Sequence, residues 1–345
     1  MPRRGIFGLT QDQGGGFLDE ADLIARYFAP LAGPGGLGLR DDAALVAPPA
    51  GAEIVLTADA LVAGVHFFAG DPPEAIAAKA LAVNLSDLAA KAADPLGFLL
   101  TIALPGDWTP QWLEVFAKGL GDLARESRCP LLGGDTVATP GPLTLSITAL
   151  GSVPAGRMIR RAGAKPGDRL YVSGTIGDAA LGLALRRAEL EGAPAPPWVD
   201  ALDAAQKAHL VRRYLVPEPR LALTPALRAC ASAAMDVSDG LAGDLSALLR
   251  ASGVGARVDL REAPLSPAAA AALRADPGLF EILFSSGDDY EILCAAAPEQ
   301  AVRFEALAGG AVTAIGEVGP ASAGAVFLGP DGDKLNFARD RYSHF

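Results

Sequence analysis

Aspartates recur at the ends of short apolar runs, and this pattern most constrains how the chain can fold. Residues 131–136 read Leu-Leu-Gly-Gly-Asp-Thr, so an apolar stretch stops at two glycines and an acid. Residues 54–59 read Ile-Val-Leu-Thr-Ala-Asp, and residues 235–241 read Met-Asp-Val-Ser-Asp-Gly-Leu before a helical repeat of leucines. Apolar strands that end in polar residues and alternate with helices predict an α/β protein with mixed sheets.

The Gly133–Gly134 pair allows two interpretations of its surroundings. Paired glycines let a backbone approach a bulky anion closely, and they place the Asp135 carboxylate at the end of a buried strand. Glycine and aspartate are also common residues of ordinary tight turns. This stretch alone does not decide between an anion cradle and a plain turn.

The length of 345 residues predicts two domains, because a domain usually has ~150 residues. A Gly- and Pro-rich stretch at 154–168 marks the expected boundary, which gives an N-terminal domain at 17–153 and a C-terminal domain at 154–345. Half of the residues are hydrophobic and a fifth are charged, so the chain can bury a large core.

The net charge of −11 argues against a nucleic-acid binder, which normally carries a basic face. It is compatible with phosphate substrates when Mg²⁺ ions lie between carboxylates and phosphate oxygens. The three cysteines are far apart and form no CxxC pair, and no apolar run approaches ~18 residues. We therefore expect a cytoplasmic protein without a membrane segment.

Periodicity and turn residues predict the order of the elements. Helices are expected from residue 73 onward and at 112–125, 178–190, 206–214, 225–234 and 241–252. Strands are expected at 54–59, 97–104, 143–150, 169–172, 255–260, 290–295, 312–318 and 325–328.

Asp87 continues an apolar stripe of the helix that begins near residue 73. It shares a face with Ile76, Ala80 and Val83, at positions i, i+4, i+7 and i+11. A carboxylate in such a stripe is costly unless a cation or strong donors accompany it, which favours a metal or ligand role. The alternative is a helix that bends near Asn84 and exposes Asp87, or a second helix that Asp87 caps.

The segment around Asp236 and Asp239 precedes another expected helix. Ser238 is positioned to cap that helix, and Gly253 to end it. A helix start suits phosphate, but two aspartates repel a bare anion, so a bridging metal is the simplest interpretation. The alternative is that the acids complement the helix dipole.

These acidic stretches together resemble the thiamine-monophosphate kinase family. The order and spacing of the motifs agree from about Phe17 to Phe345, and several motifs that match together are far more specific than one. The matching stretches are 41–45 (DDAAL), 59–67 (DALVAGVHF), 82–90 (AVNLSDLAA), 133–136 (GGDT), 163–168 (GAKPGD) and 236–241 (DVSDGL).

The resemblance implies a two-domain fold like that of aminoimidazole ribonucleotide synthetase, with a homodimer formed by the N-terminal domains and ATP bound near that interface. It also implies direct, in-line transfer of the ATP γ-phosphoryl group to thiamine monophosphate, without a phospho-enzyme. Such a reaction asks a protein chiefly to position groups and neutralise charge through metal ions, and a phosphate acceptor needs no general base.

The resemblance also assigns roles to single residues. The implied Mg²⁺ ligands are Asp42, Asp59, Asp87, Asp135 and Asp236, with Thr57 and the backbone of Ala58 nearby and Asp239 holding a further ion. The implied ATP contacts are Gly134, Asp135, Arg161 and Ser238. The implied thiamine contacts are His66, Asp288 and Tyr342.

Three positions depart from the family pattern. Arg40 replaces the usual glycine before the Asp pair, Ala58 replaces a threonine, and Asp288 replaces a glutamate and is one methylene shorter. Two other functions stay open: another ATP-dependent enzyme of the superfamily, of the aminoimidazole ribonucleotide synthetase type, and a non-catalytic nucleotide-binding protein. Buried carboxylates without a use would be destabilising, which argues against the second.

Overall fold

The protein divides into two compact units. The computed structural model describes residues 19–337. The N-terminal unit comprises the described residues up to Leu85 and Pro95–Ser152, and the C-terminal unit comprises Ser86–Asp94 and the residues from Val153 onward. One long helix, α2 (Pro73–Ala90), therefore contributes its last turns to the C-terminal unit.

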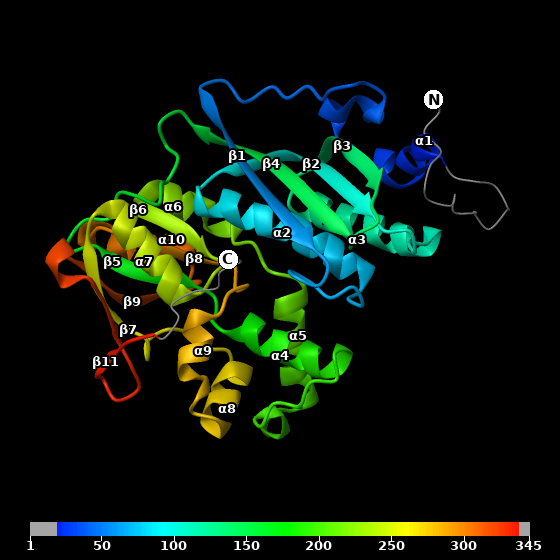
Figure 1. The fold of residues 1–345 in the computed structure, drawn as a ribbon. Coiled ribbons are helices and arrows are strands. Elements are labelled where there is room, and N and C mark those ends of the chain that lie inside the picture. The colour runs from blue at the N-terminus through cyan, green and yellow to red at the C-terminus, as the bar shows by residue number, and fades with distance from the viewer. Residues whose placement is uncertain (1–18, 338–345) are drawn as a thin grey trace. The chain divides into compact units, whose positions relative to one another are not determined.

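The N-terminal unit contains a four-stranded sheet in the order β1-β4-β2-β3. Its strands are β1 (Ala52–Val62), β2 (Asp94–Leu104), β3 (Leu131–Ala138) and β4 (Thr144–Pro154), and its helices are α1 (Glu20–Leu23), most of α2 and α3 (Pro110–Glu126). A π turn (Ile24–Phe28) and two 3₁₀ turns (Ala29–Leu31 and Pro34–Leu39) follow α1. Helices α2 and α3 cover one face of the sheet (Figure 1). β2 and β3 are parallel, as expected for strands joined through a helix.

Local sequence explains the two covering helices. Thr109 caps α3 by accepting a hydrogen bond from the Trp112 N–H at 3.1 Å, and Pro110 occupies the first turn. α2 is buried almost all round and runs unbroken through Asn84, whose side chain donates to the Ala80 carbonyl at 3.0 Å. The alternative in which Asp87 caps a second helix is therefore wrong, because α2 continues through Asp87 to Ala90.

The C-terminal unit contains a seven-stranded mixed sheet in the order β11-β10-β7-β9-β5-β8-β6. β5 pairs with β8 and β9 in antiparallel fashion, whereas β10 and β7 are parallel. The strands are β5 (Arg169–Ser173), β6 (Ala231–Val237), β7 (Gly255–Asp259), β8 (Glu291–Ala296), β9 (Val312–Gly319), β10 (Ala325–Leu328) and β11 (Lys334–Leu335).

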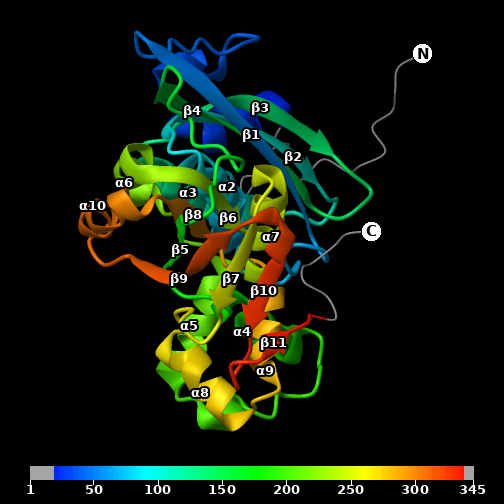
Figure 2. The ribbon, with the colours of Figure 1, turned by 90° about the vertical axis from the view of Figure 1, so that its left-hand side faces the viewer.

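Helices cover both faces of this sheet, because its central strands are apolar on both sides. Leu170, Val172 and Leu293 belong to one core, and the alternating residues Tyr171 and Cys294 to the other. α6 and α10 lie on the Tyr171 side and α7 on the opposite side (Figure 2). The helices are α4 (Asp178–Leu190), α5 (Ala204–Leu215), α6 (Thr224–Cys230), α7 (Leu241–Ser252), α8 (Pro267–Ala275), α9 (Leu279–Ser285) and α10 (Pro298–Ala308), with 3₁₀ turns at Val199–Ala201, Leu221–Leu223 and Ala321–Ala323.

Two parts of the element prediction differ from the structure. The helix expected at 225–234 ends at Cys230, and Ala231 begins β6, because pairing with β8 overrides the helical preference of alanine. Helices α8, α9 and α10 were not predicted. For α8 a signal existed, since Ser266 caps it by accepting from the Ala269 N–H and Pro267 follows.

No helix within residues 19–337 is long and apolar enough to cross a membrane. Cys129, Cys230 and Cys294 are buried and form no disulfide.

Candidate functional site

A cavity of about 750 Å³ in the N-terminal unit brings several predicted residues together. It is lined on one side by the segment that carries Asp41 and Asp42, and on the other by β2, β3 and β4. Gly134 and Asp135 also line it, and the carboxylates of Asp42 and Asp135 are exposed. The expected metal ligands Asp42 and Asp135 therefore share this cavity with Gly134, and Gly134 and Asp135 are both expected ATP contacts.

Gly134 is not part of a turn but lies inside β3, so the tight-turn interpretation is wrong. It pairs with Leu100 of β2 and has a φ of 152°. A Cβ at this position would lie 1.7 Å from the Leu100 carbonyl oxygen. The close approach of β2 therefore requires a glycine here, whether or not a nucleotide also does.

Strand β1 carries three of the predicted metal contacts. Side chains alternate along it, so Thr57 and Asp59 share a face with the buried Val55, and Ala58 is exposed on the other. The Ala58 side chain therefore points away from Thr57 and Asp59, so Ala58 can contact an ion on their side of the strand only through its backbone. β1 continues to Val62, so Asp59 lies within the strand and not at its end as predicted.

His66 closes the turn after β1. Its Nδ1 accepts a hydrogen bond from the Val62 N–H at 3.0 Å. An accepting Nδ1 places the proton of a neutral imidazole on Nε2. The turn therefore orients the half-buried ring that the resemblance assigns to thiamine.

In the C-terminal unit, Asp236 is buried beside the like charge of Asp87. Asp236 is the penultimate residue of β6 and has 8 % of its surface exposed, and its Oδ2 accepts from the Ser86 hydroxyl at 2.8 Å. Burial and, second, the charge of Asp87 raise the pKa of Asp236 to about 7. A proton or a cation is therefore needed to stabilise this pair.

Lys91 supplies part of that positive charge from the end of α2. Its ammonium group donates to the Ala234 carbonyl at 3.0 Å. Burial lowers the pKa of Lys91, Asp236 opposes that shift, and the nearby Arg161 adds to it. The exposed Arg161, an expected ATP contact, therefore lies within electrostatic reach of the Asp236 region.

The turn that carries Ser238 and Asp239 is held by a different residue from the one predicted. Gly240 is the N-cap of α7, and no side chain caps that helix, so the expected Ser238 cap is wrong. The Asp244 carboxylate instead accepts from the N–H groups of Asp239 at 2.9 Å and Gly240 at 3.2 Å. Burial raises the pKa of Asp244 to about 6 despite these donors.

Asp288 lies in the loop of residues 286–290, close in space to this turn. Its N–H donates to the Ser238 carbonyl at 2.8 Å, and its side chain is half-buried. The structure therefore joins an expected thiamine contact to an expected ATP contact. Tyr342, the third expected thiamine contact, lies outside the described residues.

The donor set fits Mg²⁺, although no complete ligand set is preformed. Within residues 19–337, no group of three or more His, Cys, Asp or Glu side chains lies close enough to hold an ion. Carboxylate oxygens are the ligands that Mg²⁺ prefers, and Asp87 and Asp236 are carboxylates whose mutual repulsion a divalent cation would relieve.

Several residues of these clusters were not among the predicted site residues. They are Lys91, Ser86, Asp244 and the buried Glu291, which directly follows the 286–290 loop and accepts from Arg213 at 2.8 Å. Asp244 and Glu291 gave usable signals, because each is an acid within an otherwise apolar helix or strand.

Comparison with known proteins defines the class first. Residues 40–153 match the family "AIR synthase related protein, N-terminal domain", and residues 165–329 match "AIR synthase related protein, C-terminal domain". The crystal structure of the hydrogenase maturation protein HypE in complex with ATP has the same fold, with a TM-score of 0.74 at 20 % identity over 96 % of this chain and 98 % of that one. The predicted two-domain α/β fold of this class is confirmed.

More similar proteins then identify the family. The chain is 47 % identical to thiamine-monophosphate kinase of Caulobacter vibrioides over 87 % of this chain and 83 % of that protein. The Escherichia coli K12 enzyme is 41 % identical over 94 % of this chain and 98 % of that enzyme. The chain belongs to the thiamine-monophosphate kinase family.

Solved structures of that family agree. The Stenotrophomonas maltophilia K279a enzyme has a TM-score of 0.73 at 40 % identity, covering 86 % of this chain and 91 % of its own. AaThiL complexed with AMPPCP and TMP has a TM-score of 0.74 at 30 % identity, and the match covers 88 % of this chain and 91 % of that one.

Proposed function

We propose that this thiamine-phosphate kinase transfers the γ-phosphoryl group of ATP directly and in line to the phosphate of thiamine monophosphate, with Mg²⁺ held by its aspartates. The buried Asp236 beside Asp87 is the observation that carries the proposal. Both reactants are anions, so an acidic site suits them only through cations. The relative AaThiL was solved with AMPPCP and TMP, which supports ATP as the co-substrate.

The assignment of the aspartates to the metal follows the resemblance to the family. Asp42, Asp59 and Asp135 of the N-terminal unit and Asp87 and Asp236 of the C-terminal unit would hold Mg²⁺, and Asp239 a further ion. Thr57 and the Ala58 backbone lie on the same strand as Asp59. Bound Mg²⁺ neutralises phosphate charge and orients the transferring group.

The remaining contacts orient the two substrates. Gly134 and Asp135 line the cavity that would admit the nucleotide, and Ser238 and Arg161 would meet its phosphates. A guanidinium suits that role because its planar donors match phosphate oxygens. His66, Asp288 and Tyr342 would hold thiamine, with His66 oriented by its bond to Val62.

We also propose a cytoplasmic homodimer formed through the N-terminal units. The four-stranded sheet exposes apolar side chains that suit an interface, among them Leu56, Leu99 and Val137, which are 63 %, 37 % and 43 % exposed. Light scattering during gel filtration tests this. A monomer at micromolar concentration contradicts the dimer, and Leu56→Glu should weaken a real one.

The activity is tested with purified protein, ATP, Mg²⁺ and thiamine monophosphate. Thiamine diphosphate and ADP should form in equal amounts. In a parallel assay supplied with an acyclic amidine ribonucleotide in place of thiamine monophosphate, ATP-dependent ring closure to aminoimidazole ribonucleotide would identify the synthetase alternative. Nucleotide binding without turnover in either assay would identify the non-catalytic one. Chirally labelled γ-phosphate tests the mechanism, because one in-line transfer inverts the phosphorus and a phospho-enzyme route retains its configuration.

A further inference from the structure

The loop of residues 286–290 adopts a backbone conformation that its side chains disfavour. Asp288 has a φ of 71° and Tyr290 a φ of 52°, in the left-handed region that glycine usually occupies. Such a conformation is unfavourable for a residue with a side chain and persists only when its surroundings impose it. Two of them in one short loop indicate that other contacts hold the loop in place.

The first set of contacts ties the loop to the turn before α7. The Asp288 N–H donates to the Ser238 carbonyl and the Tyr290 N–H to the Val237 carbonyl, each at 2.8 Å. A Cβ on Gly287 would lie 2.0 Å from the Ser238 carbonyl oxygen, so only glycine permits this approach. The loop therefore lies directly against the turn.

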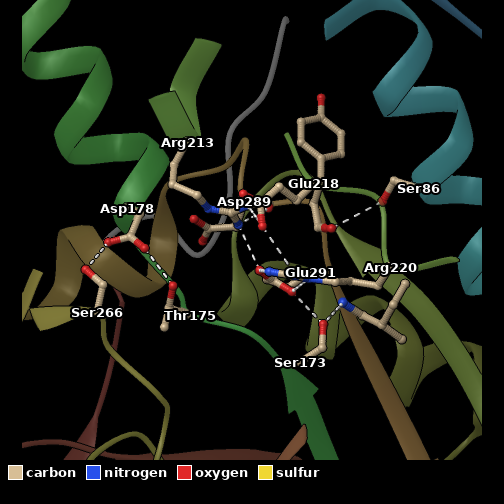
Figure 3. Close-up of polar contacts among 12 residues, drawn as sticks. Ser86, Ser173, Thr175, Asp178, Arg213, Glu218, Arg220, Ser266, Asp289 and Glu291 are labelled. Carbon is tan, nitrogen blue, oxygen red and sulfur yellow. Dashed lines mark hydrogen bonds and ion pairs between the residues drawn. The ribbon is translucent and has the colours of Figure 1, made fainter. Parts of the chain in front are cut away.

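The second set is a buried charge network centred on Glu291, which is 0 % exposed (Figure 3). Arg213, which is 3 % exposed, donates through Nη2 to Glu291 Oε1 at 2.8 Å and to the Asp289 carbonyl at 3.1 Å. Glu291 Oε2 also accepts from the Ser173 hydroxyl and from Arg220 Nε, both at 2.6 Å. Arg220 Nη2 donates to the other oxygen. Arg213 of α5 therefore holds the Asp289 carbonyl, and Glu291 of β8 in turn holds Arg213.

The Asp289 side chain anchors the same loop on its other side. Both of its carboxylate oxygens accept from the Gly177 N–H, at 3.0 and 2.9 Å, just before α4. The loop is therefore fixed by backbone and side-chain contacts from three separate elements.

This network is a poor stabiliser in itself. Buried ion pairs rarely outweigh the cost of removing both charges from water. Arg213 is also incompletely paired, because within residues 19–337 its Nε and Nη1 have no hydrogen-bond partner, and Nη1 lies 3.6 Å from Glu218. A conformational role explains such an arrangement better than a contribution to stability.

We infer that Arg213 is a positioning residue, which works with Glu291 and Arg220 to hold the 286–290 loop in its strained form and so sets Asp288 for the thiamine substrate. The inference rests on the proposed contact between Asp288 and thiamine. The turn at Ser238 and Asp239 has separate support from Asp244. Loss of Arg213 therefore affects thiamine monophosphate more than ATP.

Steady-state kinetics of Arg213→Met and Arg213→Lys test this difference. Displacing a contact residue should raise the KM for thiamine monophosphate on the order of tenfold in Arg213→Met. The KM for ATP should stay within about twofold, because Asp244 still holds the Ser238 turn. Lysine keeps the charge and should recover part of the loss. Equal changes in both KM values, or none, would overturn the inference.

Two further variants control for stability. Arg186→Met removes another buried arginine, which pairs with Glu189 at 2.6 Å away from the loop, and should leave both KM values unchanged. Arg220→Gln alters the partly exposed end of the network, at 26 % side-chain exposure, and carries the test if Arg213→Met does not fold. It should raise only the KM for thiamine monophosphate; an unchanged value contradicts the inference.

Asp288→Ala separates the inference from the assignment on which it rests. If Arg213 acts through Asp288, the double variant Arg213→Met/Asp288→Ala should have the KM of Asp288→Ala alone, and additive effects contradict the inference. A normal KM in Asp288→Ala removes the thiamine contact and the inference together. A wild-type protein without turnover removes the proposed function instead.

Discussion

The aspartates proposed to hold Mg²⁺ have contrasting surroundings in the two units. In the N-terminal unit, Asp42 and Asp135 line a cavity and are exposed. In the C-terminal unit, Asp236 is buried, bonded to Ser86 and repelled by Asp87. Residues of one type and one proposed role therefore carry different energetic costs.

The difference shows which carboxylates of the acidic site destabilise the folded protein. An exposed carboxylate is solvated before a metal arrives, so its removal changes stability little. A buried carboxylate beside a like charge destabilises the protein until a proton or cation joins it. The C-terminal unit is therefore the part that metal binding should stabilise most.

The strongest test removes the charge of Asp236. Asp236→Asn should lower kcat on the order of a thousandfold, because charge interactions are stronger at a buried site. The Asn oxygen can still accept from Ser86, so the thermal midpoint without Mg²⁺ should rise. Steady-state assays and calorimetry check both. A lower midpoint without Mg²⁺ would contradict the assigned cost.

The matching change in the N-terminal unit is Asp135→Asn. It should lower kcat about a hundredfold through loss of a metal ligand, with the free energy of unfolding changed by less than about 0.5 kcal/mol. Kinetics and urea unfolding measure the two effects. Unaltered turnover would show that Asp135 is not a metal ligand. A large loss of stability would contradict the view that exposed and buried aspartates differ in their effect on folding.

The affinity for Mg²⁺ should depend on pH through Asp236. The pKa of Asp236 is raised to about 7, so below pH 7 a proton must leave before metal binds. Between pH 5.5 and 7, affinity should rise by up to about tenfold per pH unit and then level off. Isothermal titration calorimetry measures it. Asp135→Asn should keep this dependence of Mg²⁺ affinity on pH, and Asp236→Asn should lose it. The opposite result would show that the titrating group is not Asp236 of the C-terminal unit.

The smallest expected effect is on the stability of the metal-free protein. Because the folded-state pKa of Asp236 lies above its unfolded value, the folded state holds the extra proton between about pH 4 and pH 7. This contribution to stability is therefore lost as pH rises through that range. The thermal midpoint of Asp236→Asn minus that of the wild type should therefore increase by roughly 3 °C between pH 5 and pH 8. A constant difference would show that Asp236 does not titrate there.

Sequence patterns alone predicted much of the fold and of the family. The helix expected at 112–125, the apolar strand at residues 54–59 and the Gly253 helix end follow from local signals, and the structure has each element. Such signals depend on residues a few positions apart, so they survive without knowledge of the rest of the chain. The order of the acidic motifs likewise predicted the thiamine-monophosphate kinase family, and the similarity to its members confirms it.

Only the tertiary structure decided what surrounds each acid. Gly134 fits a turn by its residue type, but β2 passes within contact of its backbone and makes it part of a strand. Arg213 and Glu291 are 78 residues apart, and no local pattern relates them. Burial and charge pairing depend on which distant segments pack together. The sequence therefore determined which carboxylates this protein has and marked some that lie in apolar stretches, and packing determined which charges and donors surround each of them.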